Sequence, residues 1–218
     1  PLLSVFYGLL FAVIPWLISF LVAMTGWHLI ILPSIVCFML IGPFLAAGLY
    51  DISWEHEKGH KPTLSHSLRA MRRNAVNEWG FGILLMILMI FWLRVASLIH
   101  ALYPQHQIES LESLMPFLIL GTGVGALFCI GMFFVTAFTQ PILLERKVDL
   151  ATAVMTSINA VWVNKVPMFI WAGIIFSIVS IGFVTGFIGF VVLMPLLGYA
   201  SWHGYIDAIE TKREREYV

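Results

Sequence analysis

The sequence predicts an all-α membrane protein with six transmembrane helices, and three observations support this class. Hydrophobic residues make up 60% of the 218 residues and charged residues only 11%, whereas soluble domains carry about 25% charged residues. Six apolar runs are long enough to cross a bilayer core, which takes about 20 helical residues. The Lys and Arg residues gather in alternate loops. We expect one domain, residues 1–218, built of helices because an isolated apolar strand would leave backbone groups unpaired in lipid.

The apolar runs give the expected position of each span. The six predicted spans cover about residues 3–24, 29–50, 80–103, 114–140, 165–184 and 187–207. The second, third and fourth runs are bounded by polar loops. The last two runs share one apolar stretch that is too long for a single helix. This stretch therefore predicts a tight helical hairpin that turns at Thr185 and Gly186.

The basic residues predict the orientation of the chain. Every Lys and Arg except Arg94 lies in the loop after the second span, in the loop after the fourth span and its end, or in the C-terminal tail. Six spans place these three segments on one side. Short loops rich in Lys and Arg stay cytoplasmic, so both termini should be cytoplasmic. The chain begins at Pro1 without an initiator Met, and we expect a preceding segment to be missing or cleaved.

Two cytoplasmic connectors should form amphipathic helices that lie along the membrane interface, at about residues 63–78 and 149–163. Each connector follows a span that enters the cytoplasm, with Pro43 or Pro141 near its inner end, and precedes a span that leaves it. Both units run in the same direction. They therefore predict a parallel internal repeat, related by an axis along the membrane normal.

Four arginines are candidate contacts for lipid or a partner. Arg69, Arg72 and Arg73 cluster in the first connector. They could bind anionic lipid or a protein, but we favour the simpler interpretation that they set the topology and touch headgroups. Arg94 is the only charged residue deep in a span. An intramembrane Arg is costly and marks a candidate site, although snorkelling toward the outer headgroups or outer acidic residues is the favoured interpretation.

Glycine pairs predict close helix packing. Gly121 and Gly125 form a G-x-x-x-G step in the fourth span, and Gly182 and Gly186 form another in the final hairpin. Such steps let helix backbones approach each other in membranes. We favour packing within this bundle. Oligomerisation, or docking onto a larger complex, stays open.

Three stretches of sequence carry a resemblance to a known family. They are Gly42-Pro43-Phe44-Leu45-Ala46-Ala47-Gly48-Leu49-Tyr50 with Ser53, Pro141-Ile142-Leu143-Leu144-Glu145-Arg146, and Pro195-Leu196-Leu197-Gly198-Tyr199-Ala200-Ser201-Trp202-His203. Together they resemble a family of bacterial integral membrane proteins known as domain of unknown function 2189. The resemblance covers nearly the whole chain, and the closing run is its most specific part.

The resemblance implies a six-span protein of the bacterial inner membrane, usually preceded by a short cytoplasmic segment. It brings no established activity, cofactor or catalytic residue. Some members are labelled as oxidase-associated. The chain departs from the family after Ser53, where an Arg-rich sequence is usual, because Trp54-Glu55-His56-Glu57-Lys58-Gly59-His60 stands there instead.

The segment at residues 54–60, where the chain differs from the family, contains a candidate metal site. His56-Glu57-Lys58-Gly59-His60 matches H-E-x-x-H, which on a helix directs two imidazoles at one zinc ion and uses the Glu to activate water. His66 or Glu55 could supply a third ligand. Gly59 inside the motif and Pro62 after it weaken the helical reading, so we favour a solvated loop and keep zinc at His56 and His60 as the alternative.

Other chemistry has weaker support. His28 and His100 lie near the outer ends of two spans and could ligate a haem, but interfacial His in an aromatic belt is the favoured interpretation. Cys37 and Cys129 lie inside apolar runs, which excludes a secreted disulfide scaffold. We expect no catalytic residue, no cofactor and no nucleic-acid partner.

The sequence thus favours a non-enzymatic protein whose surroundings are the lipid bilayer. Its best-supported role is an accessory or assembly subunit of a larger membrane complex, with a respiratory complex as one option, docked through the Gly-rich helix faces. Transport of a lipid or small apolar solute is the second hypothesis, since few polar residues lie in the membrane. A membrane zinc metalloprotease through His56 and His60 is the third.

Overall fold

The computed structural model describes residues 2–26, 31–70, 72, 74–102, 111–146 and 148–209. The described part of the chain is all helical, as predicted. Its helices are α1 (Leu2–Thr25), α2 (Ile31–Glu57), α3 (Leu64–Ala70), α4 (Ala75–Leu102), α5 (Leu111–Thr136), α6 (Thr139–Arg146), α7 (Leu150–Val163), α8 (Lys165–Val184) and α9 (Phe190–Ala208).

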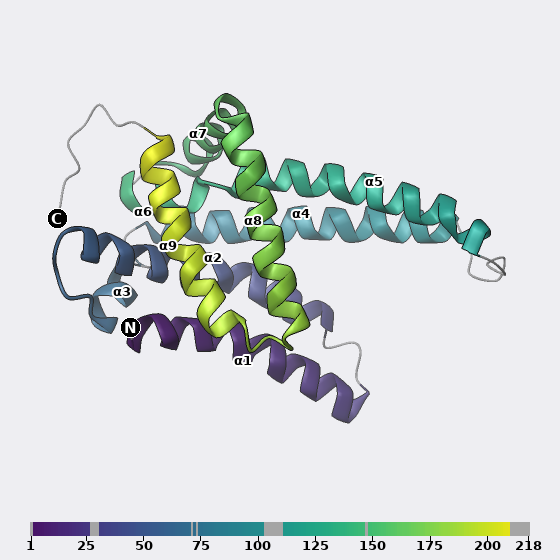
Figure 1. Cartoon of the computed structure of the whole chain (residues 1–218), viewed down its shortest axis with the longest axis horizontal. Helices are drawn as coiled ribbons and strands as arrows, with labels where there is room; N and C mark the ends of the chain where they lie inside the picture. Colours follow the sequence, from purple (N-terminus) through teal and green to yellow (C-terminus); the bar gives the residue numbers. More distant parts are fainter. Residues whose placement is uncertain are drawn as a thin grey trace.

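The helices form three hairpins, α1 with α2, α4 with α5 and α8 with α9, which share one end, and the start of α9 crosses α1 (Figure 1). We call the shared end the connector end; it consists of α3, α6, α7 and residues 200–208. The α4–α5 hairpin extends well beyond the other helices, and α8 and α9 run across its direction. The shape is therefore a fan of hairpins and not a parallel bundle.

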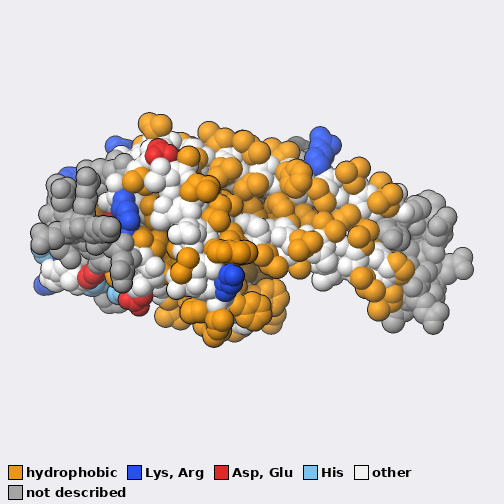
Figure 2. Space-filling model, turned by 90° about the horizontal axis from the view of Figure 1, so that it is seen from above, with side chains coloured by type: hydrophobic (Ala, Val, Ile, Leu, Met, Phe, Trp, Pro, Cys, Tyr) orange, Lys and Arg blue, Asp and Glu red, His pale blue; other side chains and the backbone are white. Residues whose placement is uncertain are grey.

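Four segments among the described residues are long and apolar enough to cross a membrane. They are Leu2–Thr25, Ala75–Leu102, Leu114–Arg146 and Lys165–Val184. Figure 2 shows hydrophobic side chains over most of the visible described surface, with charged side chains mainly toward the connector end. A membrane protein with several apolar helices is thus established. Spans at α2 and α9, which would bring the number to six, stay a prediction.

Two apolar cores hold the hairpins together. One lies at the connector end and combines side chains of α2, α4, α6, α7 and α9. The other joins α1 to α2 and α9 through Tyr7, Phe11, Leu49 and Phe190. Gly8 lets α1 touch the backbone of α9, because a Cβ atom there would overlap the Val191 carbonyl group. Close contact between small residues is how membrane helices gain packing energy.

Two expected elements differ from the structure at the connector end. The helix expected at residues 63–78 is divided between α3, which ends at Ala70, and the first turn of α4, which begins at Ala75. Asn74 lies between them and donates its side-chain N–H groups to the carbonyls of Leu143 and Val148, at 3.2 and 3.1 Å. These bonds to another part of the chain hold the break in place.

The fourth predicted span, residues 114–140, is also interrupted, because α5 ends at Thr136 and α6 begins at Thr139. In a continuous helix the N–H of Phe138 would bond to the carbonyl of Phe134. Instead, the hydroxyl of Ser157 accepts from the Phe138 N–H at 3.1 Å and donates to the Phe134 carbonyl at 2.9 Å. A side chain inserted into the helical ladder is a recognised cause of a kink.

The expected turn of the final hairpin lies between α8 and α9. Gly186 has a φ of 61°, in the left-handed region that favours glycine. The Thr185 hydroxyl accepts the N–H of Gly189 at 3.0 Å. Gly186 thus lies in the turn, as the sequence predicts, and its second predicted role, packing with Gly182, has no contact in the structure because a Cβ atom at Gly186 would meet no atom within 4 Å.

Candidate functional site

The connector end holds a cluster of ionisable side chains where α2 meets α3. This polar cluster consists of Asp51, Glu55, Lys58, His60 and His66. The ring of His66 has Nδ1 2.8 Å from Oδ2 of Asp51 and Nε2 3.9 Å from Oε1 of Glu55. Lys58 and His60 approach Glu55 at 3.3 and 3.4 Å. The side chain of Asp51 is 1% exposed, so the His66 ring offers a polar partner to a group that is removed from water.

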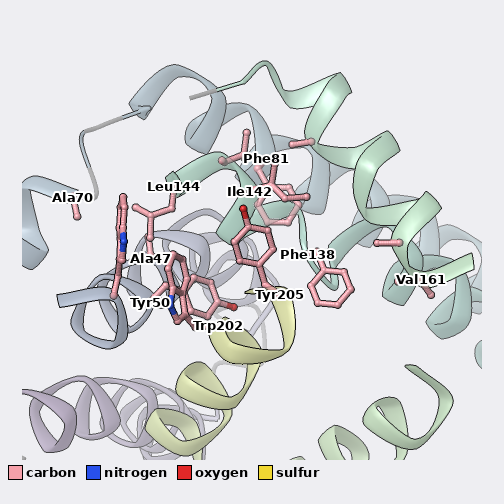
Figure 3. Close-up of a cluster of buried hydrophobic side chains, with 14 of the residues drawn as sticks. Ala47, Tyr50, Ala70, Phe81, Phe138, Ile142, Leu144, Val161, Trp202 and Tyr205 are labelled. Atoms are coloured by element: carbon pink, nitrogen blue, oxygen red, sulfur yellow. The ribbon is translucent and has the colours of Figure 1, made fainter. Parts of the chain in front are cut away.

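An aromatic cluster lies beside it and joins α9 to α2 and α6 (Figure 3). Its members are Tyr50, Trp54, Phe138, Trp202 and Tyr205. The ring centroids of Trp54 and Trp202 are 5.6 Å apart, and those of Phe138 and Tyr205 are 6.5 Å apart. Such pairs add about 0.5–1.5 kcal/mol beyond their area burial. The cluster therefore fixes the end of α9 against the connectors.

Polar groups at the rim of the aromatic cluster orient it. The Trp202 indole N–H donates to Oε2 of Glu57 at 3.3 Å. Nε of Arg146 donates to the Tyr205 hydroxyl at 3.0 Å, and that hydroxyl donates to Glu145. Trp202 and Tyr205 thus bury an apolar body while their polar tips form hydrogen bonds.

A buried acid lies between the two halves of the chain, of which the first contains α1 to α4 and the second contains α5 to α9. Glu78 of α4 and Gln140 of α6 are 0% and 4% exposed, and Nε2 of Gln140 donates to Oε2 of Glu78 at 2.8 Å. A second link is formed by Asn77, whose Oδ1 accepts the N–H of Leu150 at 3.1 Å. Both links join the start of α4 to the chain around α6 and α7.

Each connector helix is tied to the preceding long helix by a serine. Ser67 of α3 donates to the carbonyl of Gly48 at 3.0 Å and shares a hydrogen bond of 2.7 Å with the Tyr7 hydroxyl. Ser157 of α7 binds the backbone of Phe138 and Phe134 in α5 and the turn that follows. Ser67 donates to a carbonyl 19 residues before it, whereas Ser157 donates to a carbonyl 23 residues before it. Each tie fastens a connector helix to the long helix that precedes it.

Capping fixes the start of both connector helices. Oγ1 of Thr63 accepts the N–H of His66 at 3.3 Å, and Oδ2 of Asp149 accepts the N–H of Thr152 at 3.0 Å. The hydroxyl of Thr152 also donates to Asp149, and these hydrogen bonds hold the pKa of Asp149 below its usual value.

The H-E-x-x-H segment does not adopt the helix on which zincin chemistry depends. Helix α2 ends at Glu57, and Gly59 has a φ of 75°. His56 is exposed, whereas His60 turns back toward Glu55. No group of three or more His, Cys, Asp or Glu side chains among the described residues could hold a metal ion.

The candidate arginine contacts are exposed where the structure describes them. Arg69 at the end of α3, Arg72 after it and Arg94 within α4 all reach the surface. Arg73 lies outside the described residues. The three described arginines are therefore accessible to lipid or a partner, and that role stays a prediction.

The candidate packing glycines have different surroundings. Gly125 lies against the Trp92 ring of α4, and Gly182 lies against the Phe190 ring of α9. A Cβ atom at Gly121 would meet no atom within 4 Å. One member of each G-x-x-x-G step thus packs inside the described part of the chain, while Gly121 and Gly186 do not.

A family model described as predicted integral membrane protein (DUF2189) matches residues 31–145. The chain belongs to this family. The match covers α2 to α5 and nearly all of α6, including α3 at the connector end, and it confirms the predicted membership. The closing run at residues 195–203, which carried part of the resemblance, lies outside it. No curated protein and no solved structure matches the chain.

The chemistry of the connector end in this DUF2189 protein is that of a clamp. Both ring nitrogens of His66 face carboxylates, so the imidazole is engaged in holding α3 to α2. The Ser67 and Ser157 hydroxyls are bound to backbone groups. The His66, Ser67 and Ser157 side chains therefore connect helices within the protein.

Sequence reasoning missed the groups that form this clamp. Ser67, Ser157 and the Glu78–Gln140 pair were not singled out, because hydropathy assigns polar residues to water. A signal was present: Ser, Ala and Asn recur at the same spacing in Ser67-x-x-Ala70-x-x-x-Asn74 and in Ser157-x-x-Ala160-x-x-x-Asn164.

The tie through Ser157 gives a direct prediction. Ser157→Ala should lower the free energy of unfolding by about 1–3 kcal/mol, because it leaves the buried Phe138 N–H without a partner. Thermal unfolding of the purified protein in one detergent measures this. The control is Ser177→Ala, which removes an exposed bond to Gly173 within α8. Equal melting temperatures for the two variants would contradict the role of Ser157.

Proposed function

We propose that this protein is a non-enzymatic accessory or assembly subunit of a larger membrane complex. In this proposal it crosses the bacterial inner membrane six times, with both termini in the cytoplasm. A respiratory complex is the class that the oxidase-associated labels in the family suggest.

One observation carries the proposal: the projecting α4–α5 hairpin has an uncovered face that contains glycines. On α5, Phe128 and Gly125 pack against Trp92 of α4. Gly123 and Gly131 are exposed, and a Cβ atom at either would meet no atom within 4 Å. Small residues in membrane helices favour close contact with another helix. This face therefore fits a helix of a partner subunit.

The filled junction between the two halves supports an accessory role over transport. One apolar core fills this junction. It includes Phe81 of α4, Ile142 of α6, Ala153 of α7 and Phe138, which immediately precedes α6. A transporter with two rocking units would need a cavity at this junction. The hydrogen bond between Gln140 and Glu78 crosses the same region and opposes separation of the halves.

Six spans are supported by the packing of α2 and α9. Helix α9 lies along α1, and α2 packs against both α1 and α4, each of which is a candidate span. The recurrence of Ser, Ala and Asn at the same spacing in the two connectors supports the parallel repeat. The connectors gather at one end of the fan (Figure 1), in agreement with the distribution of Lys and Arg.

Cysteine labelling tests this topology. In a protein with Cys37 and Cys129 replaced, Arg72→Cys and Ala151→Cys should react only with a reagent applied from the cytoplasm. Ile188→Cys, in the turn between α8 and α9 where the side chain is 74% exposed, should react only from the opposite side. Labelling of Arg72→Cys and Ala151→Cys from different sides would refute six spans.

Co-purification tests the accessory role. The native protein, extracted from its own membranes in mild detergent, should carry other membrane polypeptides in fixed stoichiometry. Gly123→Leu combined with Gly131→Leu should release them, because the larger side chains keep a partner helix away. The matched control is Gly173→Leu on α8, where a Cβ atom also meets open space. A native protein that runs alone, or equal retention by both variants, would refute the proposal.

A further inference from the structure

The divergence of α5 and α8 leaves an apolar groove in the second half of the chain. The groove has a volume of about 630 Å³, within the range of about 300–1,000 Å³ typical of ligand sites. Phe133 and Phe134 of α5 line one wall, and Phe169, Ala172 and Phe176 of α8 line the other. Such a groove fits an apolar ligand taken from the membrane.

The walls of the groove suit a flexible chain better than a partner helix. Helices approach closely in membranes where small residues face each other, whereas the lining of this groove includes five phenylalanines: Phe133, Phe134, Phe169, Phe176 and Phe183. Large rings keep a helix backbone at a distance and leave narrow slots between them. A hydrocarbon chain can occupy such slots.

One end of the groove carries a positive charge. Lys165, the first residue of α8, lines the groove and is exposed. Its Nζ lies 4.1 Å from the centroid of the Trp162 ring, a cation–π contact that steadies the ammonium group. No carboxylate within the described ranges forms a salt bridge with it. The ammonium group is therefore available to an anion at the groove mouth.

The length of the groove matches a lipid. Its lining on α8 runs from Lys165 to Phe183, which at a rise of about 1.5 Å per residue is about 27 Å. The hydrocarbon core of a bilayer is about 30 Å thick, so an acyl chain from one leaflet would reach the middle of the groove, near Ala172 and Ile175. The Lys–Trp pair then lies at the depth of the headgroups, where such side chains gather.

We propose that this groove binds one anionic phospholipid, with an acyl chain between α5 and α8 and its phosphate at Lys165. The lipid comes from the leaflet on the connector side of the membrane. It fills the space that the spread hairpins leave open and joins α5 to α8. Neither Gly123 nor Gly131 lines the groove, and the lipid site and the accessory role are tested by different variants.

Native mass spectrometry of the purified full chain tests this site. The delipidated protein is mixed with equal amounts of phosphatidylglycerol and phosphatidylcholine that carry the same acyl chains. The wild type should retain one phosphatidylglycerol molecule in preference to phosphatidylcholine. Lys165→Gln should reduce that preference by about fivefold, the effect of one basic residue at a membrane surface. Lys165→Arg should preserve it.

Blocking the groove separates the site from general lipid contact. Ala172→Phe should remove the bound lipid of either kind, whereas Ile174→Phe, an exposed neighbour outside the lining, should not. Lys61→Gln controls for the loss of one exposed charge. Equal retention of both lipids by the wild type would overturn the proposal. So would a Lys165→Gln variant that behaves like Lys61→Gln, or an Ala172→Phe variant that keeps its lipid.

Discussion

Burial of hydrogen-bonding side chains at one end of the molecule is the constraint on which the rest of the structure depends. A hydroxyl or amide removed from water must find a partner inside the protein, because an unpaired group costs several kcal/mol in an apolar environment. Ser67, Asn74 and Ser157 meet this demand with backbone groups of other helices. These bonds join segments that lie far apart in the sequence. The connectors are consequently part of the folded core, and the hairpins extend from a fixed end.

Hydropathy predicted the long helices well where their ends are also the ends of apolar runs. Helix α8, Lys165–Val184, has the predicted bounds of 165–184. The same reasoning is inaccurate where a polar residue is buried. The second span was expected to end at residue 50, but α2 continues to Glu57 because Asp51 and Glu55 lie inside the polar cluster. Polarity marks the end of a helix in a sequence only when the polar side chain reaches water.

The candidate sites were likewise predictable from the sequence only in part. The H-E-x-x-H spacing was visible in the sequence, but its chemistry depends on a helix that ends before His60, at the left-handed Gly59. The clamp left a faint signal in the recurring Ser, Ala and Asn positions of the two connectors. The groove left none, since it arises from the divergence of α5 and α8, which pack mainly against α7 and α9 respectively. Lys165 becomes a candidate anion-binding residue only because that three-dimensional arrangement places it at the groove.

The hydrogen-bonded connector end and the diverging hairpins together suggest how the protein works with its surroundings: internal bonds fix the connector end, and lipid or a partner helix occupies the space beside the hairpins. Hydrogen exchange of the protein in lipid nanodiscs tests the clamp most directly. Amides of α3 and α7, which lie outside the candidate spans, should exchange as slowly as those of buried α2, because their opening requires disruption of the core. Exchange as rapid as that of the loop at residues 58–63 would show that the connectors merely rest on the membrane surface, and would contradict this account.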